Sequence, residues 1–102
     1  MRKYKISVDL LARQDVKEAG KWYNQQQKGL ERRLNADLKT VLLSIAANPT
    51  SFAIRYRNIR LANLSIFPFA VHFFIEESAA TVFVVAVIHT SRHPSLGEIR
   101  IS

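Results

Sequence analysis

Two apolar segments near the end of the chain decide the fold. They are Phe67-Pro-Phe-Ala-Val-His-Phe-Phe-Ile-Glu-Glu77 and Thr81-Val-Phe-Val-Val-Ala-Val-Ile-His-Thr-Ser-Arg-His-Pro94. Both are apolar at almost every position and rich in β-branched and aromatic residues, which is typical of strands covered on both faces. The short turn between them predicts an antiparallel hairpin. The second strand leads directly into a cationic cluster formed by His89, Arg92 and His93.

Two amphipathic helices are predicted upstream of this hairpin, over residues 9–26 and 30–47. The apolar residues of the first are spaced by four, three and four positions, and Asp9 suits its N-cap. These residues are Ala12, Val16, Ala19 and Tyr23. Those of the second are Leu30, Leu34, Leu38, Val41 and Ile45, and Asn48-Pro49 ends it because the residue before a proline avoids helical geometry. Since each helix has one apolar stripe, we expect an antiparallel helical pair packed on a sheet.

The remaining segments complete the predicted sheet. Tyr4–Val8 alternates as a half-buried strand does, and Ile54–Leu61 is interpreted as one strand with a curve or a bulge. Pro68 indicates an edge strand or a bulge. The order is β-α-α-β-β-β. We therefore predict an α+β fold, with a helical hairpin packed on a mostly antiparallel twisted sheet, and one domain over residues 1–102.

Composition narrows the class of protein. The chain has 102 residues, 15 Lys and Arg against 8 Asp and Glu, and a formal net charge of +7, which favours a polyanionic or acidic partner. No acidic residue stands between Asp37 and Glu76. The absence of cysteine excludes disulfides and thiol chemistry. The N-terminus lacks the apolar stretch of a signal peptide and no run is long enough to span a membrane, so we expect a cytoplasmic protein without membrane contact.

The order of elements and three local patterns resemble the RelE/ParE superfamily of type II toxins, most closely its ParE-like branch. The first pattern is Ala12-x-x-Asp15-Val16-x-x-Ala19-x-x-x-Tyr23, and the second is Asn48-Pro49 followed by Ile59-Arg60. The third combines Phe67-Pro-Phe-Ala-Val-His-Phe73 with Val85-Ala-Val-Ile-His89-x-x-Arg92-x-Pro94. The resemblance covers nearly the whole chain.

The resemblance implies a growth-inhibiting toxin that a cognate antitoxin neutralises, of a kind associated with plasmid stabilisation. Operator DNA would be bound only indirectly, through the antitoxin. ParE-like members inhibit DNA gyrase and are not hydrolases, whereas RelE-like members cleave messenger RNA on the ribosome. RelE-like enzymes usually carry a basic residue near the position of Ala70 and a tyrosine close to the C-terminus, and here no tyrosine follows Tyr56. We therefore favour a gyrase inhibitor, with a ribosome-dependent endoribonuclease as the alternative.

Candidate site residues follow from these two interpretations. An endoribonuclease needs a base, an acid and cations at the phosphate, and the candidates for those roles are Arg60, His89, Arg92 and His93. The candidates for binding the antitoxin or the target are Arg55, Arg57, Arg60, His89 and Arg92. We expect no cofactor. A metal pair of His89 and His93 is disfavoured because Pro94 and the strand end spoil the spacing and no acidic ligand is nearby.

Each candidate also has a structural interpretation. His72 alternates with apolar neighbours and is expected to be a hydrogen-bonded core histidine. Arg55, Arg57 and Arg60 could form an ordinary solvated strand face, and Trp22 and Tyr23 are expected to fill the core. A plain nucleic-acid-binding module is disfavoured because the aromatic residues lie in apolar strands rather than between cations.

Overall fold

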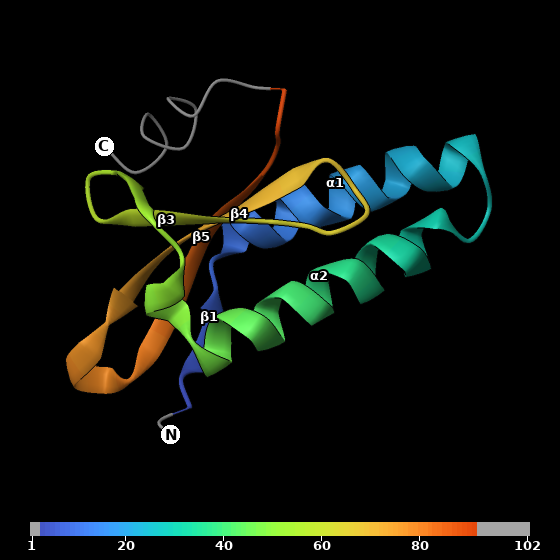
Figure 1. Ribbon diagram of the computed structural model, residues 1–102. Helices are drawn as coiled ribbons and strands as arrows, with labels where there is room; N and C mark the ends of the chain where they lie inside the picture. The colour runs from blue at the N-terminus through green and yellow to red at the C-terminus, as the bar shows by residue number, and fades with distance from the viewer. Residues whose placement is uncertain (1–2, 92–102) are drawn as a thin grey trace.

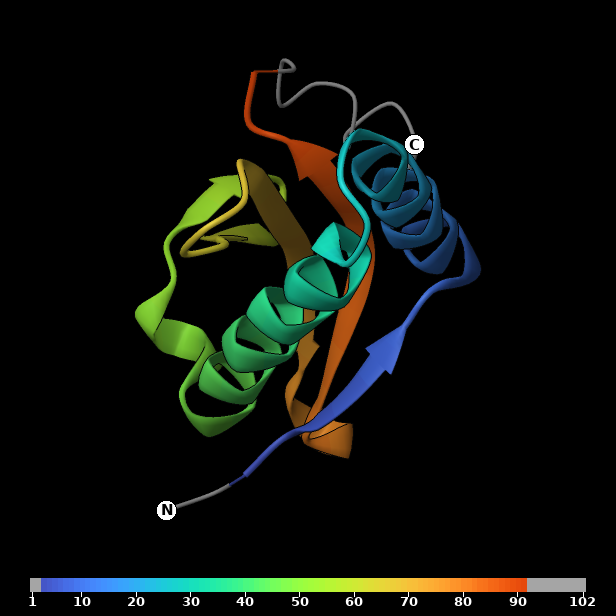
Figure 2. The ribbon, with the colours of Figure 1, turned by 90° about the vertical axis from the view of Figure 1, so that its right-hand side faces the viewer.

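The computed structural model describes residues 3–91, which form a helical pair on one face of a five-stranded sheet (Figures 1 and 2). The strands are β1 (Lys5–Val8), β2 (Ile54–Tyr56), β3 (Ile59–Asn63), β4 (Phe69–Glu76) and β5 (Thr81–His89). The helices are α1 (Leu10–Gln26) and α2 (Leu30–Ala47), and short 3₁₀ turns occupy Pro49–Ser51 and Glu77–Ala79. The predicted α+β class is confirmed.

The sheet has the strand order β1-β5-β4-β3-β2. β1 pairs in parallel with β5, whereas every other pair is antiparallel. The predicted hairpin at the end of the chain is therefore β4 and β5, and it occupies the middle of the sheet. Pro68 lies just before β4. Because β4 has a partner strand on each side, the prediction of an edge strand there is wrong.

The segment interpreted as one strand, residues 54–61, is two strands. A tight turn at Arg57 and Asn58 separates β2 from β3, with Tyr56 paired to Ile59. Arg57 takes a left-handed conformation at φ 49°. Arg-Asn is not the Asn-Gly or Asp-Gly sequence that marks such turns, which is why the sequence pattern did not reveal it.

The helix ends follow the local sequence. The Asp9 carboxylate accepts a hydrogen bond from the Leu11 N–H at 2.9 Å and caps α1, as predicted. Gly29 adopts φ 95° immediately before α2, a conformation that glycine enters without steric cost. Figure 1 shows the two helices antiparallel, and Figure 2 shows α2 in front of β4 and β5, with α1 beside the upper part of β5.

The core lies between the helices and the sheet. It contains the stripe of α2 and the residues of β4 and β5 that point to the helices, with Ile45, Val71, Phe73 and Val82 fully buried. Asp37 is the exception in the stripe: it is 4% exposed, and its carboxylate accepts hydrogen bonds from the N–H groups of Ser65, Ile66 and Phe67 at 2.9–3.2 Å. This carboxylate fixes the loop between β3 and β4. No helix within residues 3–91 has the length and apolar character needed to cross a membrane.

Candidate functional site

β5 extends beyond its parallel partner. β1 pairs with β5 from Lys5–Thr81 to Val8–Val84, and the chain then turns at Asp9 into α1. Within the described part of the chain, no strand pairs with the outer edge of residues 85–89. α1 runs beside that edge instead (Figure 2). The second half of β5 is therefore an edge flanked by a helix.

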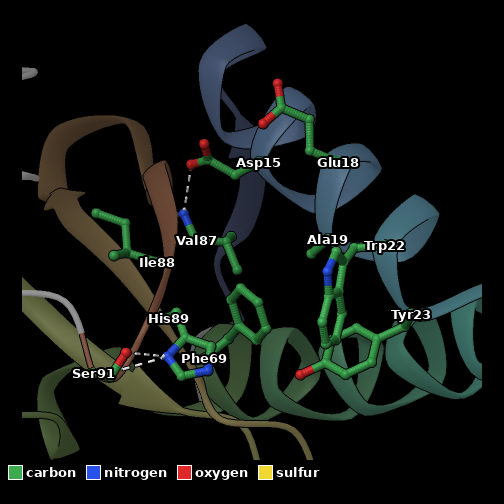
Figure 3. A pocket seen from close by; sticks show the side chains of 10 residues that line it. All are labelled: Asp15, Glu18, Ala19, Trp22, Tyr23, Phe69, Val87, Ile88, His89 and Ser91. Atoms are coloured by element: carbon green, nitrogen blue, oxygen red, sulfur yellow. Dashed lines mark hydrogen bonds between the residues drawn. The ribbon is translucent and has the colours of Figure 1, made fainter. Parts of the chain in front are cut away.

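A bulge at Val85 turns this edge toward α1. His72 pairs with Ala86 and Phe73 pairs with Val84, so β5 has one residue more than β4 at this point. A bulge shifts the alternation of the strand by one residue. Beyond it, the N–H of Val87 points away from β4 and donates to the Asp15 carboxylate at 3.0 Å (Figure 3). Asp15 thus joins α1 to β5.

The space between the helix and this edge is a groove of about 580 Å³, here called the α1–β5 groove (Figure 3). Its lining residues come from α1, β4, β5 and the turn after β5, and they are Asp15, Glu18, Ala19, Trp22, Tyr23, Phe69, Val87, Ile88, His89 and Ser91. Neighbouring aromatic rings meet edge to face along it, as Tyr23 does with Phe69 and Phe69 with His89. A groove with an aromatic wall and a few polar groups is suited to binding a partner.

Trp22 stands at the rim of this groove. It is 56% exposed and its ring meets that of Tyr23 at a centroid distance of 5.0 Å. The prediction that Trp22 fills the core is wrong, whereas Tyr23 is half-buried and packs on Phe67. A tryptophan left half in water beside a groove is typical of an interface hot spot. Asp15 and Glu18 add negative charge to the same flank of α1.

His89 lies between two cavities. It lines the α1–β5 groove and also a second cavity of about 200 Å³ on the helix-free face of the sheet, together with Arg55 and His72. The Nδ1 of His89 accepts a hydrogen bond from the Ser91 N–H at 3.1 Å, and the Ser91 hydroxyl lies 2.7 Å from the same nitrogen. These contacts hold the imidazole at the end of β5.

Two other candidates have structural bonds. His72 is 2% exposed, and its Nδ1 lies 2.9 Å from the Tyr56 hydroxyl. Arg60 is half-buried, and its guanidinium donates to the Phe52 carbonyl at 2.6 Å and to the Thr50 carbonyl at 3.5 Å. Arg60 therefore ties β3 to the segment that follows α2.

The remaining candidates are spread over the sheet. Arg55 and Arg57 are exposed on β2 and on the turn after it. Arg60 pairs with Phe73 and His89 pairs with Phe69, on opposite sides of β4 and four residues apart along it. From ordinary strand geometry their Cα atoms are about 16 Å apart. Arg92 and His93 lie outside the described residues.

Arg55 and His89 line the second cavity, whereas Arg60 does not line it and is bonded to the Phe52 carbonyl. Sequence reasoning did not identify Trp22 as exposed, and it assigned no role to Asp15 or Asp37. A signal was present for Asp37, since a carboxylate inside the apolar stripe of a helix must find hydrogen-bond donors. Within residues 3–91, no group of three or more His, Asp or Glu is arranged to hold a metal ion.

A family model described as "ParE toxin of type II toxin-antitoxin system, parDE" matches residues 6–94 of the chain. No curated protein sequence matches significantly.

Solved structures with the same fold include toxins of two kinds. A chain of the chromosomal ParDE toxin–antitoxin system from P. aeruginosa is similar at a TM-score of 0.74 and 11% identity, over 85% of this chain and 96% of that one. The RelBE2 toxin–antitoxin complex from Mycobacterium tuberculosis gives 0.61 and 18%, over 85% of this chain and 98% of that one. The E. coli RelBE complex gives 0.61 and 17%, over 87% and 99%. At these identities the likeness establishes the fold.

Proposed function

Because the chain belongs to the ParE toxin family of type II toxin–antitoxin systems, we propose that it inhibits growth by binding DNA gyrase and that a cognate antitoxin neutralises it. The observation that carries the proposal is the family match over residues 6–94, which spans the described sheet and both helices. The same solved fold occurs in ParDE and RelBE toxin–antitoxin complexes, which supports an antitoxin as the partner.

The α1–β5 groove is the proposed binding site for the antitoxin. Its aromatic wall can take an apolar side chain, and the outer edge of β5 lies beside it. Trp22 provides a large apolar surface at the rim. Arg55, Arg57 and the other predicted binding residues, Arg60, His89 and Arg92, would meet acidic residues of the antitoxin or of gyrase. Affinity carried by the exposed arginines decreases with added salt because exposed charge pairs are screened.

Two of the candidate catalytic side chains, Arg60 and His72, are engaged in bonds within the protein, which supports inhibition by contact rather than by catalysis. The Arg60 guanidinium is bonded to backbone carbonyls, and the Cα atom of His89 lies about 16 Å from that of Arg60 by strand geometry. With its guanidinium held in this way, Arg60 is not placed to share one phosphate with His89. His72 is buried and bonded to Tyr56.

The alternative is a ribosome-dependent endoribonuclease. The second cavity favours it, since Arg55, His72 and His89 line one hollow on the helix-free face of the sheet. In that case the catalytic groups would be drawn from Arg60, His89, Arg92 and His93, with no metal.

A direct test uses the purified full chain with gyrase and with programmed ribosomes, separately. We expect the protein to slow gyrase supercoiling without ribosomes and to leave message intact. The double variant His89→Gln with His93→Gln should keep its toxicity, whereas an enzyme that lost its general acid and base would slow by about 10²–10⁴-fold. Charge reversal of Arg55 and Arg57 to Glu should weaken gyrase inhibition, and the same change at Lys5 serves as the control.

The proposal fails if gyrase is untouched, the parent protein cuts message on ribosomes, and the folded double variant is harmless. Circular dichroism of each variant establishes that it is folded.

A further inference from the structure

The two flanks of α1 have opposite charge. Asp15 and Glu18 lie on the flank that lines the α1–β5 groove. By ordinary helix geometry Lys17 lies about 60° and Lys21 about 100° around α1 from Gly20, and both side chains are exposed. Gly20 faces α2 so closely that a Cβ there would come within 2.7 Å of a Glu31 carboxylate oxygen. The lysines therefore border the line along which the two helices meet.

Exposed cations lie on the solvent side of this contact in both helices, since Arg32 and Lys39 are about 100° and 80° around α2 from Glu31, which meets Gly20. Lys17 and Lys21 on α1, Lys28 in the link, and Arg32 and Lys39 on α2 are all exposed. This set is here called the cationic seam. The side chains of these five residues make no hydrogen bond or ion pair within the part of the chain that the structure describes. Glu31 is half-buried between the helices, and Glu18 lies three residues before Lys21 on α1.

The cationic seam lies on two helices, and the side chains that it offers to a partner are charged rather than aromatic. The helices hold Lys17 and Lys21 about 6 Å apart along one row, since four residues of helix rise by that amount. The only aromatic residues of the two helices are Trp22 and Tyr23, and both line the groove on the other flank of α1. A seam without aromatic rings offers no platform for stacking unpaired bases and no anchor typical of a protein hot spot.

We propose that the cationic seam binds the phosphate backbone of double-stranded DNA, without reading its sequence. A duplex presents closely spaced phosphates at fixed geometry, which matches a row of cations on a rigid support. The cations reach phosphates and not base edges, so the contacts position the protein and carry no sequence information. The site is separate from the α1–β5 groove, and the inference does not depend on the target of the toxin.

The test is binding of the purified full chain, without antitoxin, to a labelled duplex of about 25 base pairs at several salt concentrations. If each cation neutralises one phosphate, the logarithm of the affinity should fall with the logarithm of salt with a slope of about −4.5. Two duplexes of unrelated sequence should bind equally, and the single strands of the same length should bind less tightly.

The matched variants each remove three charges. Changing Lys17, Lys21 and Lys39 to Gln should reduce the slope to about −2 and the affinity at 50 mM salt by on the order of a thousandfold. Changing Lys3, Lys5 and Arg33 to Gln removes the same charge from exposed side chains outside the seam and should leave most of the affinity. Both variants alter only exposed side chains, so both should fold.

Four results would overturn the inference. They are no binding by the parent at 50 mM salt, equal losses in the two triple variants, tighter binding of the single strands, and binding confined to one duplex sequence. If the parent binds an acidic polypeptide but does not bind the duplex at 50 mM salt, that outcome counts as the first of these results. Gyrase inhibition measured on the same variants reports separately on the proposed function.

Discussion

The Asp15 carboxylate accepts the Val87 N–H at 3.0 Å at the point where β5 has lost its parallel partner. A backbone donor on an unpaired strand edge would otherwise face the groove without a protein acceptor. Asp15 supplies that acceptor from a helix, so α1 substitutes at one position for the missing strand. The bond joins α1 to the strand edge that forms the opposite side of the groove.

Asp15→Ala should therefore destabilise the protein. Removing the acceptor leaves a part-buried N–H without its partner, which costs about 1–3 kcal/mol. Asp15→Asn retains an amide oxygen and should cost less. Urea denaturation of both variants measures the difference, and Gln14→Ala, on the exposed neighbour, is the control. Equal destabilisation by Ala and Asn would show that the hydrogen bond is not what matters.

Asp37→Ala should have a larger effect. Three backbone N–H groups lose a charged acceptor inside the protein, and the expected cost is about 3 kcal/mol or more. The measurement is the urea midpoint, with Lys39→Ala as the control on the exposed face of the same helix, which should cost under about 0.5 kcal/mol. A loss at Asp37 no greater than at Lys39 would contradict the anchoring of the loop.

Trp22→Ala should separate binding from stability. At 56% exposure, Trp22 contributes little to the core, so the change in unfolding free energy should stay below about 1 kcal/mol. As a hot spot it should weaken the antitoxin complex by at least about 30-fold, which calorimetric titration can measure. Leu43→Ala is the matched control, since Leu43 is 55% exposed on α2 and does not line the groove. Equal antitoxin affinity of the parent protein, Trp22→Ala and Leu43→Ala would show that Trp22 is not part of the interface.

Ala80→Gly should stabilise the protein. Ala80 is held at φ 46° after the turn at Glu77–Ala79, and a side chain there costs about 1 kcal/mol that glycine avoids. Ala79→Gly, one residue earlier and outside the left-handed region, should instead destabilise it by about 0.5 kcal/mol or more. Thermal melting of the two variants tests the opposite signs, and a shift of both in one direction would reject the explanation.

Periodicity predicted the helices and the central hairpin well because packing in these elements is repetitive. The first helix was predicted over residues 9–26 and is Leu10–Gln26, and the second has the predicted bounds. The turn at Arg57 and Asn58 was missed because Arg-Asn lacks the glycine that usually marks a turn with positive φ. The groove could not be predicted since it requires the end of β1 and the bulge in β5 to coincide.

The parallel pairing of β1 with β5 also sets when the protein can fold during its synthesis. Among residues 3–91, Lys5–Val8 pair with no strand except Thr81–Val84, so β1 is synthesised first but cannot pair until β5 has been made. At ordinary elongation rates that interval is on the order of several seconds. While Thr81–Val84 are still inside the ribosomal exit tunnel the sheet cannot be completed, and the groove beside β5 does not yet exist. Capture of the folded surface by a partner is therefore a step that follows translation of nearly the whole described chain.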